Sequence, residues 1–188
     1  MDFQMSKQII EKLVWIDLET TGLELKKDKI IEIAVLITDK DLNLLDSKGY
    51  TGYVGITEDD ISLMRAFVKD MHTSNGLIEI CKKSKLSLED IDKQATEYIS
   101  KFVKEKEAPI CGNNIAFDRS FINYNMPLLS NYLHYRNIDV STVKQLSMIW
   151  KGDKYKKKDG RHEALDDIKK SIEELRYYKE GIFDKNHD

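Results

Sequence analysis

Acidic side chains at three separate places in the sequence have the types and spacing that could hold a metal ion. Asp17 and Glu19 stand two residues apart in a short apolar run, so in a strand both would leave the same face. Asp118 follows a segment typical of a strand, a Gly/Asn turn and a helix start, and His162 opens the run HEALDD, which ends at Asp167. Each feature also has a plainer explanation, because an Asp-x-Glu pair can end a solvated strand and the helix dipole favours an acid in a first turn.

The run HEALDD begins a predicted helix and contains two neighbouring aspartates. The expected apolar stripe of this helix consists of Leu165, Ile168, Ile172 and Leu175. At 100° per residue, Asp167 flanks that stripe whereas Asp166 faces away from it. We expect Asp167 to reach a site beneath the helix and Asp166 to be solvated.

Four carboxylates and one imidazole are the side chains of a two-metal phosphodiesterase site. Hard divalent cations such as Mg²⁺ and Mn²⁺ take oxygen ligands, and two of them about 4 Å apart can stabilise both the attacking and the leaving oxygen of an in-line displacement. Histidine titrates near neutral pH, so His162 is the candidate general base. The sequence has no Cys/His zinc motif, no phosphate-binding glycine loop and no GxSxG nucleophile motif.

The composition indicates a folded chain without a long track for nucleic acid. Its 188 residues are 41% hydrophobic and 34% charged, with a formal net charge of −3 and therefore no basic excess for neutralising many phosphates. No apolar run approaches the roughly 20 residues that span a bilayer, and residues 1–11 have neither signal nor transit composition, so a cytoplasmic protein is expected. Cys81 and Cys111 are too few for a disulfide framework and are expected to be reduced, buried thiols.

Hydrophobic periodicity predicts three strands followed by alternating helices and strands. Residues 13–19 and 30–38 are apolar and rich in β-branched side chains, and the second run is expected at the centre of the sheet. Alternation beyond a polar break at 39–41 suggests an antiparallel meander. A helix starting at Thr57 is expected to keep one apolar face as far as Met71. The other expected elements are helices at 87–103, 117–124, 142–150 and 163–178, and strands at 109–111 and 137–140.

This order of elements predicts an α/β fold. The sheet is expected to be mixed, with an antiparallel meander plus parallel strands, and flanked by α-helices. With only two prolines and no Gly/Ser-rich linker, residues 1–188 are expected to form a single domain. Trp15, Phe121 and Trp150 stand among apolar neighbours, so we expect them in the core and not on a surface for stacking bases.

Short segments spread over nearly the whole chain, in a fixed order, resemble one known group of enzymes. They are WIDLETTGL, IIEIAVLITD, HTSNGL, ICGNNIAFDRSF, MPLL, HYRNIDVST and HEALDDI. Together they resemble the DEDDh branch of the DnaQ-like 3′→5′ exonucleases and, within it, the oligoribonuclease family. The resemblance implies a ribonuclease H-like fold and a single 3′→5′ exonuclease domain.

The resemblance also assigns roles to individual residues. It implies that two Mg²⁺ or Mn²⁺ ions bind to four acids and that His162 activates the attacking water. Those acids are Asp17, Glu19, Asp118 and Asp167. Leu23 matches a leucine that wedges between the bases of a bound dinucleotide. The residues matching those around the 5′-phosphate of the substrate are His72, Tyr135, Arg136 and Ser141, of which Tyr135 and Arg136 are implied to act across a homodimer.

One substrate-binding position departs from the pattern of the family. Asn114 stands where bacterial relatives usually carry serine, so a hydroxyl contact with phosphate is lost there, although an amide could still donate. A basic run between Lys154 and Arg161 has two interpretations of equal weight, a solvated loop or a flexible rim that attracts anionic substrate.

These features predict an exoribonuclease that removes 5′-mononucleotides from the 3′ end of very short RNAs, 5′-phosphorylated dinucleotides above all. A proofreading or tRNA-trimming exonuclease of the same branch is the nearest alternative, but such enzymes lack the HYRxxDVST and HTxxGL segments. A non-catalytic nucleic-acid adaptor on the same fold would be expected to have lost ligands, whereas all five positions are filled here. The expected partners are short oligoribonucleotides and a second copy of the chain, without a membrane.

Overall fold

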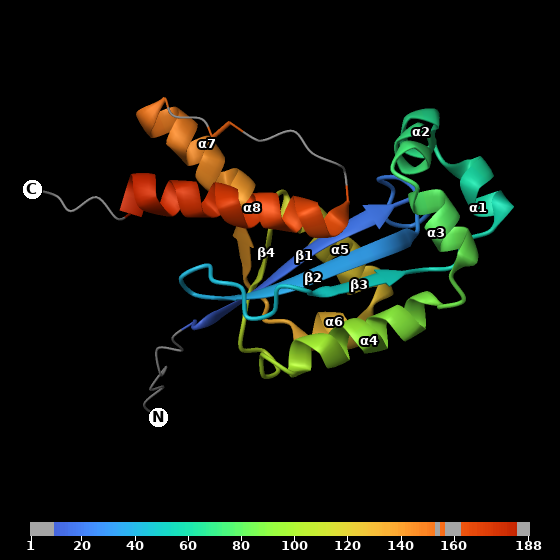
Figure 1. Ribbon diagram of the computed structural model, residues 1–188, viewed down its shortest axis with the longest axis horizontal. Coiled ribbons are helices and arrows are strands. Elements are labelled where there is room, and N and C mark those ends of the chain that lie inside the picture. Colours follow the sequence, from blue (N-terminus) through green and yellow to red (C-terminus); the bar gives the residue numbers. More distant parts are fainter. Residues whose placement is uncertain (1–9, 153–154, 157–162, 184–188) are drawn as a thin grey trace, which may run out of the picture.

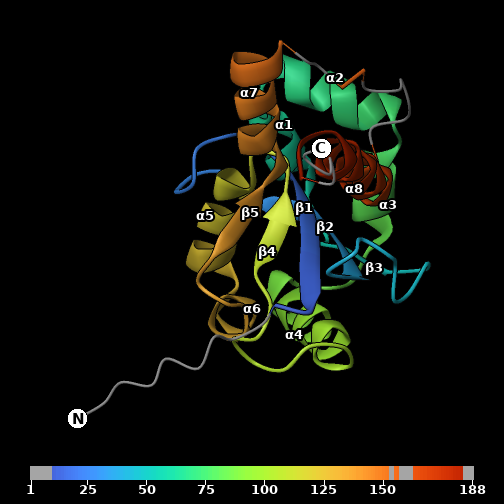
Figure 2. The same cartoon turned by 90° about the vertical axis from the view of Figure 1, so that its left-hand side faces the viewer.

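A five-stranded mixed sheet forms the centre of the protein. The computed structural model describes residues 10–152, 155–156 and 163–183. The strands are β1 (Lys12–Thr20), β2 (Ile30–Asp39), β3 (Tyr50–Tyr53), β4 (Ile110–Gly112) and β5 (Asn137–Asp139). Their spatial order is β3-β2-β1-β4-β5, as Figure 2 shows. The first three strands are antiparallel, and β4 and β5 continue the sheet in parallel with β1.

The central strand is β1, not β2. The expectation that residues 30–38 lie at the centre is therefore wrong by one position, although β2 is still paired on both edges. Its almost wholly apolar composition reflects burial on both faces, because every residue from Ile30 to Thr38 is buried. A strand with neighbours on both sides and helices on both faces is buried whether or not it is the middle one.

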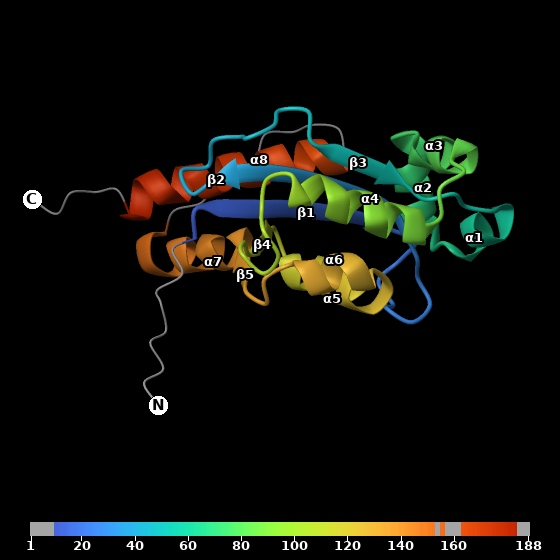
Figure 3. The same cartoon turned by 90° about the horizontal axis from the view of Figure 1, so that it is seen from below.

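Helices cover both faces of the sheet. Their bounds are α1 (Glu58–Leu63), α2 (Ala66–Ser74), α3 (Leu77–Lys83), α4 (Leu88–Ser100), α5 (Ile115–Asn125), α6 (Pro127–Tyr132), α7 (Val140–Lys151) and α8 (Ala164–Tyr178), followed by a π-helical turn (Lys179–Phe183). Figure 1 shows α8 over one face with α7 behind it, α4 and α6 on the opposite face, and α1–α3 grouped at one end. Figure 3 shows α4 running along the sheet with α5 and α6 beside it.

The two faces of β1 belong to two different cores. Val14, Ile16 and Leu18 point into the core that includes α4, α5 and α6. The alternate residues Leu13 and Trp15 point into the core beneath α7 and α8. Asp17 and Glu19 continue this second series, so strand geometry directs both carboxylates to the face that α8 covers.

The region between β3 and α4 differs from its prediction. One helix was expected from Thr57 to Met71, but the chain breaks at Met64, which adopts an extended conformation and ends α1. A new helix follows, and Phe67 on it is 78% exposed, so the predicted apolar face is not continuous. Helices α3 and α6 were not predicted, because neither six- nor seven-residue helix is long enough to show a clear period.

One predicted core residue lies on the surface. Trp15 and Phe121 are buried as expected, but Trp150 near the end of α7 is 71% exposed, beside the similarly exposed Ile149. Apolar neighbours in the sequence do not specify which side of a helix faces the sheet. Both cysteines are free and buried, as predicted. Within the described residues, no helix is both long and apolar enough to cross a membrane.

Candidate active site

Three of the predicted acidic ligands meet at the end of β1. One carboxylate oxygen each from Asp17, Glu19 and Asp167 lie within 4.8 Å of one another. The first two leave the same face of β1, and the third comes from the first turn of α8, which packs on that face. Residues about 150 positions apart in the sequence therefore form one cluster, because a helix crosses the face to which the strand directs its acids.

The fourth predicted acid, Asp118, reaches the same strand from the α5 side. It lies in the first turn of α5, is 5% exposed, and accepts a hydrogen bond of 3.0 Å from the backbone N–H of Leu18 through Oδ1. This bond holds the Asp118 carboxylate against β1 at Leu18, the residue between Asp17 and Glu19. The negative charge of Asp118 also helps to raise the pKa of Asp17.

The structure separates the neighbouring aspartates of α8 as the helical wheel predicts. The Asp167 side chain is 19% exposed and joins the cluster, whereas that of Asp166 is 45% exposed and faces outward. Lys170 lies one turn further along α8, with its Nζ 2.9 Å from Asp167 Oδ1. This lysine offsets part of the negative charge at the site.

Burial raises the pKa values of Asp17, Glu19 and Asp118, and repulsion from nearby carboxylates adds to the effect. Burial raises the pKa of Asp17 well above its usual range, and the charges of Asp118, Glu19 and Asp167 add to the effect. The pKa of Glu19 rises to about 8, first through burial and then through nearby carboxylates. Burial raises the pKa of Asp118 to about 7, although the bond from Leu18 opposes the shift. A bound cation would therefore compete with protons for Asp17, Glu19 and Asp118.

A fifth acid, Glu32, belongs to the same neighbourhood and was missed by the sequence analysis. It lies on β2 directly opposite Glu19 and is 5% exposed. Burial raises its pKa to about 7, with a further contribution from the charge of Glu163. The signal in the sequence was a single carboxylate within the apolar run IIEIAVLIT, because a buried charge is costly without a compensating group.

Leu23 lies at the tip of a loop that Asp28 organises. The leucine is 69% exposed, as a side chain that contacts a ligand would be. Asp28 accepts hydrogen bonds from the Thr21 hydroxyl at 3.0 Å and from the Glu24 backbone N–H at 2.7 Å. A Cβ at Gly22 would come within 2.5 Å of the Asp28 carboxylate, so glycine allows this close approach. Asp28 was not singled out in the sequence.

His72 lies deeper than a residue of an outer phosphate site. Its side chain is fully buried, with Nε2 3.0 Å from the Thr20 carbonyl oxygen and Nδ1 3.9 Å from Glu19 Oε2. Burial lowers the pKa of the imidazole. The structure thus brings His72 against the carboxylates at the end of β1, and its contact with a 5′-phosphate stays a prediction.

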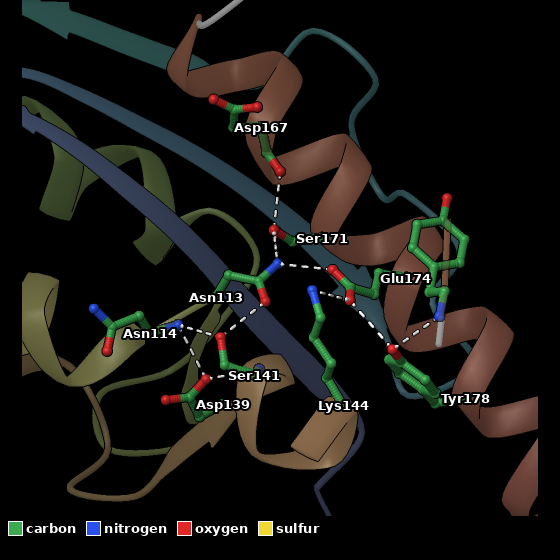
Figure 4. Close-up of polar contacts among 10 residues, drawn as sticks. Asn113, Asn114, Asp139, Ser141, Lys144, Asp167, Ser171, Glu174 and Tyr178 are labelled. Carbon is green, nitrogen blue, oxygen red and sulfur yellow. Dashed lines mark hydrogen bonds and ion pairs between the residues drawn. The ribbon is translucent and has the colours of Figure 1, made fainter. Parts of the chain in front are cut away.

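Two further predicted substrate residues lie together at the start of α5 and α7 (Figure 4). The Asn114 backbone N–H donates to the Ser141 hydroxyl oxygen and to Asp139 Oδ1, both at 3.0 Å. The Asn114 side chain is exposed, and its backbone is left-handed with φ of 53°, a conformation that asparagine tolerates better than most residues. Asp139 caps α7 by accepting from the Ser141 backbone N–H at 2.9 Å.

Tyr135 and Arg136 are exposed in the segment between α6 and β5. Arg136 Nε donates to the Tyr135 hydroxyl oxygen at 3.1 Å, and its guanidinium carbon lies 5.4 Å from the centroid of that ring. The pair projects from the surface, since Tyr135 is 75% exposed. His162, the predicted base, and most of the basic run before it lie outside the described residues.

The chemistry of the clustered acids fits a hard divalent cation. Carboxylate oxygens from Asp17, Glu19, Asp118 and Asp167 are the ligands that Mg²⁺ and Mn²⁺ prefer. Burial and repulsion raise the cost of ionising Asp17 and Glu19, and a bound cation would compensate that cost. The described residues of the cluster offer no thiolate, so a zinc site of the cysteine type is not formed there.

The raised pKa values predict that metal-free protein loses stability as the pH rises. Glu19 has a pKa of about 8 when folded and near 4 when unfolded, so its protonated form stabilises the folded chain at acid pH and this contribution is lost as the pH approaches 8. Between pH 6 and 8 the free energy of unfolding in chelator should fall by about 2 kcal/mol from this group alone. Urea denaturation at several pH values would measure the decrease.

Substitution and metal addition provide the controls for this pH dependence. Glu19→Gln should reduce this pH dependence and leave the contributions of Asp118 and Glu32, whereas Asp166→Asn at the exposed position next to Asp167 should leave it unchanged. Added Mg²⁺ or Mn²⁺ should stabilise the protein more at pH 8 than at pH 6, because metal ions bind the deprotonated carboxylates. A metal-free protein that becomes more stable from pH 6 to 8 would contradict the electrostatics described for the cluster.

Comparison of the fold with solved structures finds exonucleases. Exonuclease I from Methylocaldum szegediense superimposes with a TM-score of 0.70 at 16% identity, covering 90% of this chain and 40% of that one. An E. coli exonuclease I structure with a 5cy-dT13 oligonucleotide gives a TM-score of 0.69 at 14% identity, covering 92% and 41% of the two chains. This chain therefore shares a ribonuclease H-like fold with less than half of each exonuclease I chain.

Comparison of the sequence is more specific. Residues 14–175 match the RNase_T exonuclease family model. The oligoribonuclease of Haemophilus ducreyi is 45% identical over 94% of this chain and 97% of its own length. The oligoribonuclease of Acinetobacter baylyi is 43% identical over 97% of this chain and 100% of its own. Because the matches cover the acids of β1, α5 and α8 and extend over nearly the whole of each relative, this chain belongs to the oligoribonuclease family of exonucleases.

Proposed function

We propose that this chain is a 3′→5′ exoribonuclease that degrades very short oligoribonucleotides, above all 5′-phosphorylated dinucleotides, to 5′-mononucleotides. The observation that carries this proposal is the meeting of Asp17, Glu19 and Asp167 within 4.8 Å, beside Asp118. Membership of the oligoribonuclease family supports short RNA as the substrate class. Residues 1–188 would act as one exonuclease domain, in the cytoplasm.

The four clustered acids would hold two divalent ions, Mg²⁺ or Mn²⁺. When bound, such ions offset the charge on the phosphodiester and lower the pKa of water. The chain itself supplies a rigid frame for them, because Asp17 and Glu19 lie on the central strand and Leu18 between them fixes Asp118. Asp118 is buried in this frame, whereas Asp17 is partly exposed.

His162 would accept the proton of the attacking water. Its position one residue before Glu163, the N-cap of α8, keeps it within a few residues of Asp167 along the chain. A histidine can accept this proton without being a metal ligand itself. The basic run before it would raise the local concentration of anionic substrate.

The proposed substrate length follows from contacts at both ends of a dinucleotide. Leu23 would pack between the two bases, and Ser141 and Arg136 would bind the 5′-phosphate, with Asn114 and His72 nearby. Charged hydrogen bonds contribute about 1.5–3 kcal/mol each, and a terminal phosphate carries more charge than an internal phosphodiester. A chain with net charge −3 offers no basic track that would favour longer RNA.

The length dependence of binding tests this function. With Ca²⁺ replacing the catalytic metal, the 5′-phosphorylated dinucleotide should bind more tightly than RNAs of three to seven nucleotides, and removing its 5′-phosphate should weaken binding by at least about tenfold. Isothermal titration would measure each affinity. Affinity that climbs with length and ignores the 5′ end would favour a general exonuclease, the alternative from the same branch.

Neighbouring aspartates on α8 provide a matched pair of variants for catalysis. Asp167→Asn removes a proposed metal ligand and should reduce turnover of the dinucleotide by at least about 10³-fold, with the fold retained. Asp166→Asn removes the same charge one residue away on the exposed side and should stay active. Release of mononucleotide from a labelled dinucleotide measures both. An inactive Asp166→Asn with an active Asp167→Asn would show that the helix presents the other aspartate.

The proposed homodimer would complete each site with residues of the partner. Tyr135 and Arg136 project from the surface, and the adjacent apolar side chains of Ile149 and Trp150 on α7 are about 70% exposed. These exposed residues support a symmetric dimer, in which the same surface of both copies is used. Each active site would then combine the acids of one chain with Tyr135 and Arg136 of the other.

Mixing two inactive variants tests whether the site is shared. His162→Ala lacks the proposed base and Arg136→Ala lacks the residue that crosses to the partner, so each should be nearly inactive alone. In the mixed dimer one of the two sites is intact, and random mixing should restore roughly a quarter of the wild-type activity. Turnover of a labelled dinucleotide after unfolding and refolding the two variants together would measure it. No recovery would place Arg136 within its own site or outside the reaction.

A further inference from the structure

Tyr135 and Arg136 stand in a short segment whose two ends are held by one buried arginine. Arg119 lies on α5, which packs beside β5 (Figure 2), and is 9% exposed. Its Nη2 donates to the carbonyl oxygen of His134, and its Nε donates to Asn137 Oδ1 at 3.2 Å. These acceptors come directly before Tyr135 and directly after Arg136, so the guanidinium brackets the pair.

The charge of Arg119 has no carboxylate partner among the described residues. Burial lowers the pKa of its guanidinium, and no nearby acid opposes this shift. Its two hydrogen bonds go to a carbonyl oxygen and an amide oxygen, both of which are neutral. Burying an unpaired cation is costly, and an apolar side chain would fill the same space without that cost. What an arginine adds is a planar group with donors in fixed directions, which can hold two acceptors at once.

The segment between the two acceptors is otherwise loosely held. Backbone pairing fixes each end separately, since the His134 N–H donates to the Ala108 carbonyl oxygen at 3.3 Å and Asn137 pairs with Ile110 on β4. Between the ends, the Tyr135 side chain is 75% exposed and borders a cavity of about 450 Å³. The buried guanidinium joins the two ends to each other and thereby sets the course of the chain between them.

Contacts within the segment transmit this course to the two exposed side chains. His134 Nδ1 accepts from the Arg136 backbone N–H at 3.1 Å, and the imidazole stacks on the Tyr135 ring with centroids 4.4 Å apart. Arg136 Nε in turn donates to the Tyr135 hydroxyl oxygen at 3.1 Å. Burial, and then nearby cations with Arg136 first among them, lower the pKa of His134, which keeps Nδ1 an acceptor near neutral pH. A shift of the His134 backbone would therefore move both members of the pair.

We propose that Arg119 is a positioning residue that presents Tyr135 and Arg136 to the active site of the partner subunit. Arg119 itself does not touch the substrate. The preceding residue of α5, Asp118, is a proposed metal ligand of the chain's own site, so one turn of this helix would serve both sites of the dimer. Because the action of the pair across a homodimer belongs to the proposed function, this inference rests on that function.

Arg119→Lys is the direct test, because lysine keeps the charge but replaces the planar group with a single ammonium. It can no longer hold both ends of the segment, so kcat/KM for the dinucleotide should fall roughly tenfold. Lys106→Gln is the matched control, since it removes a positive charge from the lining of the same cavity and should change kcat/KM less than about twofold. An equal loss in Lys106→Gln would assign the effect to charge and overturn the positioning role.

Mixing with a chain that lacks a metal ligand shows which site Arg119 serves. In a mixed dimer of Arg119→Lys and Asp167→Asn, the site with intact acids receives Tyr135 and Arg136 from the chain in which Arg119 is unchanged. Refolding equal amounts of the two variants together should therefore give roughly a quarter of the wild-type activity. If Arg119 acted on its own site through Asp118, the mixture should give only about a twentieth, and that result would overturn the inference.

Variants of the exposed Asn137 keep the test independent of whether the buried position tolerates lysine. Asn137→Ala removes one of the two acceptors and should lower kcat/KM several-fold. Asn137→Asp keeps an acceptor and places a negative charge opposite the guanidinium, so it should retain the activity of the wild type. Full activity of Asn137→Ala, or a loss that Asn137→Asp shares, would overturn the positioning role.

The outcomes distinguish this inference from the proposed function. If His162→Ala and Arg136→Ala fail to complement each other, the shared site is contradicted and the inference falls with it. If they complement each other, but Arg119→Lys with Asp167→Asn gives only about a twentieth of the wild-type activity, the positioning role alone is overturned. Arg119→Lys mixed with Arg136→Ala should stay near that low value, because neither chain then presents an intact pair, and recovery in this mixture would also overturn the inference.

Discussion

The constraint on which this structure depends is the crowding of carboxylates at the buried end of one strand. Burial is the largest cause of the raised pKa of Asp17, Glu19 and Asp118, and mutual repulsion adds to it for the first two. Such a cluster would separate if its frame could move. It is held because β1 is hydrogen-bonded on both edges and packed on both faces, so the free energy of the cores offsets the cost of the site.

The two helical layers contribute one acid each to this strand. Asp118 comes from α5 on the side of the larger core, and Asp167 comes from α8 on the opposite side. Neither layer alone could surround a cation at the end of β1, so the site exists only where the sheet is covered on both faces.

The parts of the fold and site that could be predicted are those governed by a local period. Neighbouring residues alone predict these elements: the strand pattern predicts β1 and β2, the capping box predicts the start of α4, and the helical wheel predicts the orientation of α8. The wheel also places Asp167 inward. The prediction of one helix through Met71 was wrong because Met64 adopts an extended conformation. No glycine or proline in that stretch of the sequence marks the break. The prediction that Trp150 lies in the core was wrong because packing against the sheet, and not the composition of the helix, determines which side of α7 is buried.

The residues that sequence analysis missed share a different property: their partners are distant in the chain. Asn113 contacts Ser171 and Glu174, which lie 58 and 61 residues away, and Glu32 faces Glu19 only through the register of two strands. The helical wheel of α8 gave no signal for this face, because it places Glu174 as far from the apolar stripe as Asp166. A buried polar face requires donors and acceptors from elsewhere. The loop after β4 and the start of α7 supply them, and these are the segments that also carry the proposed phosphate contacts.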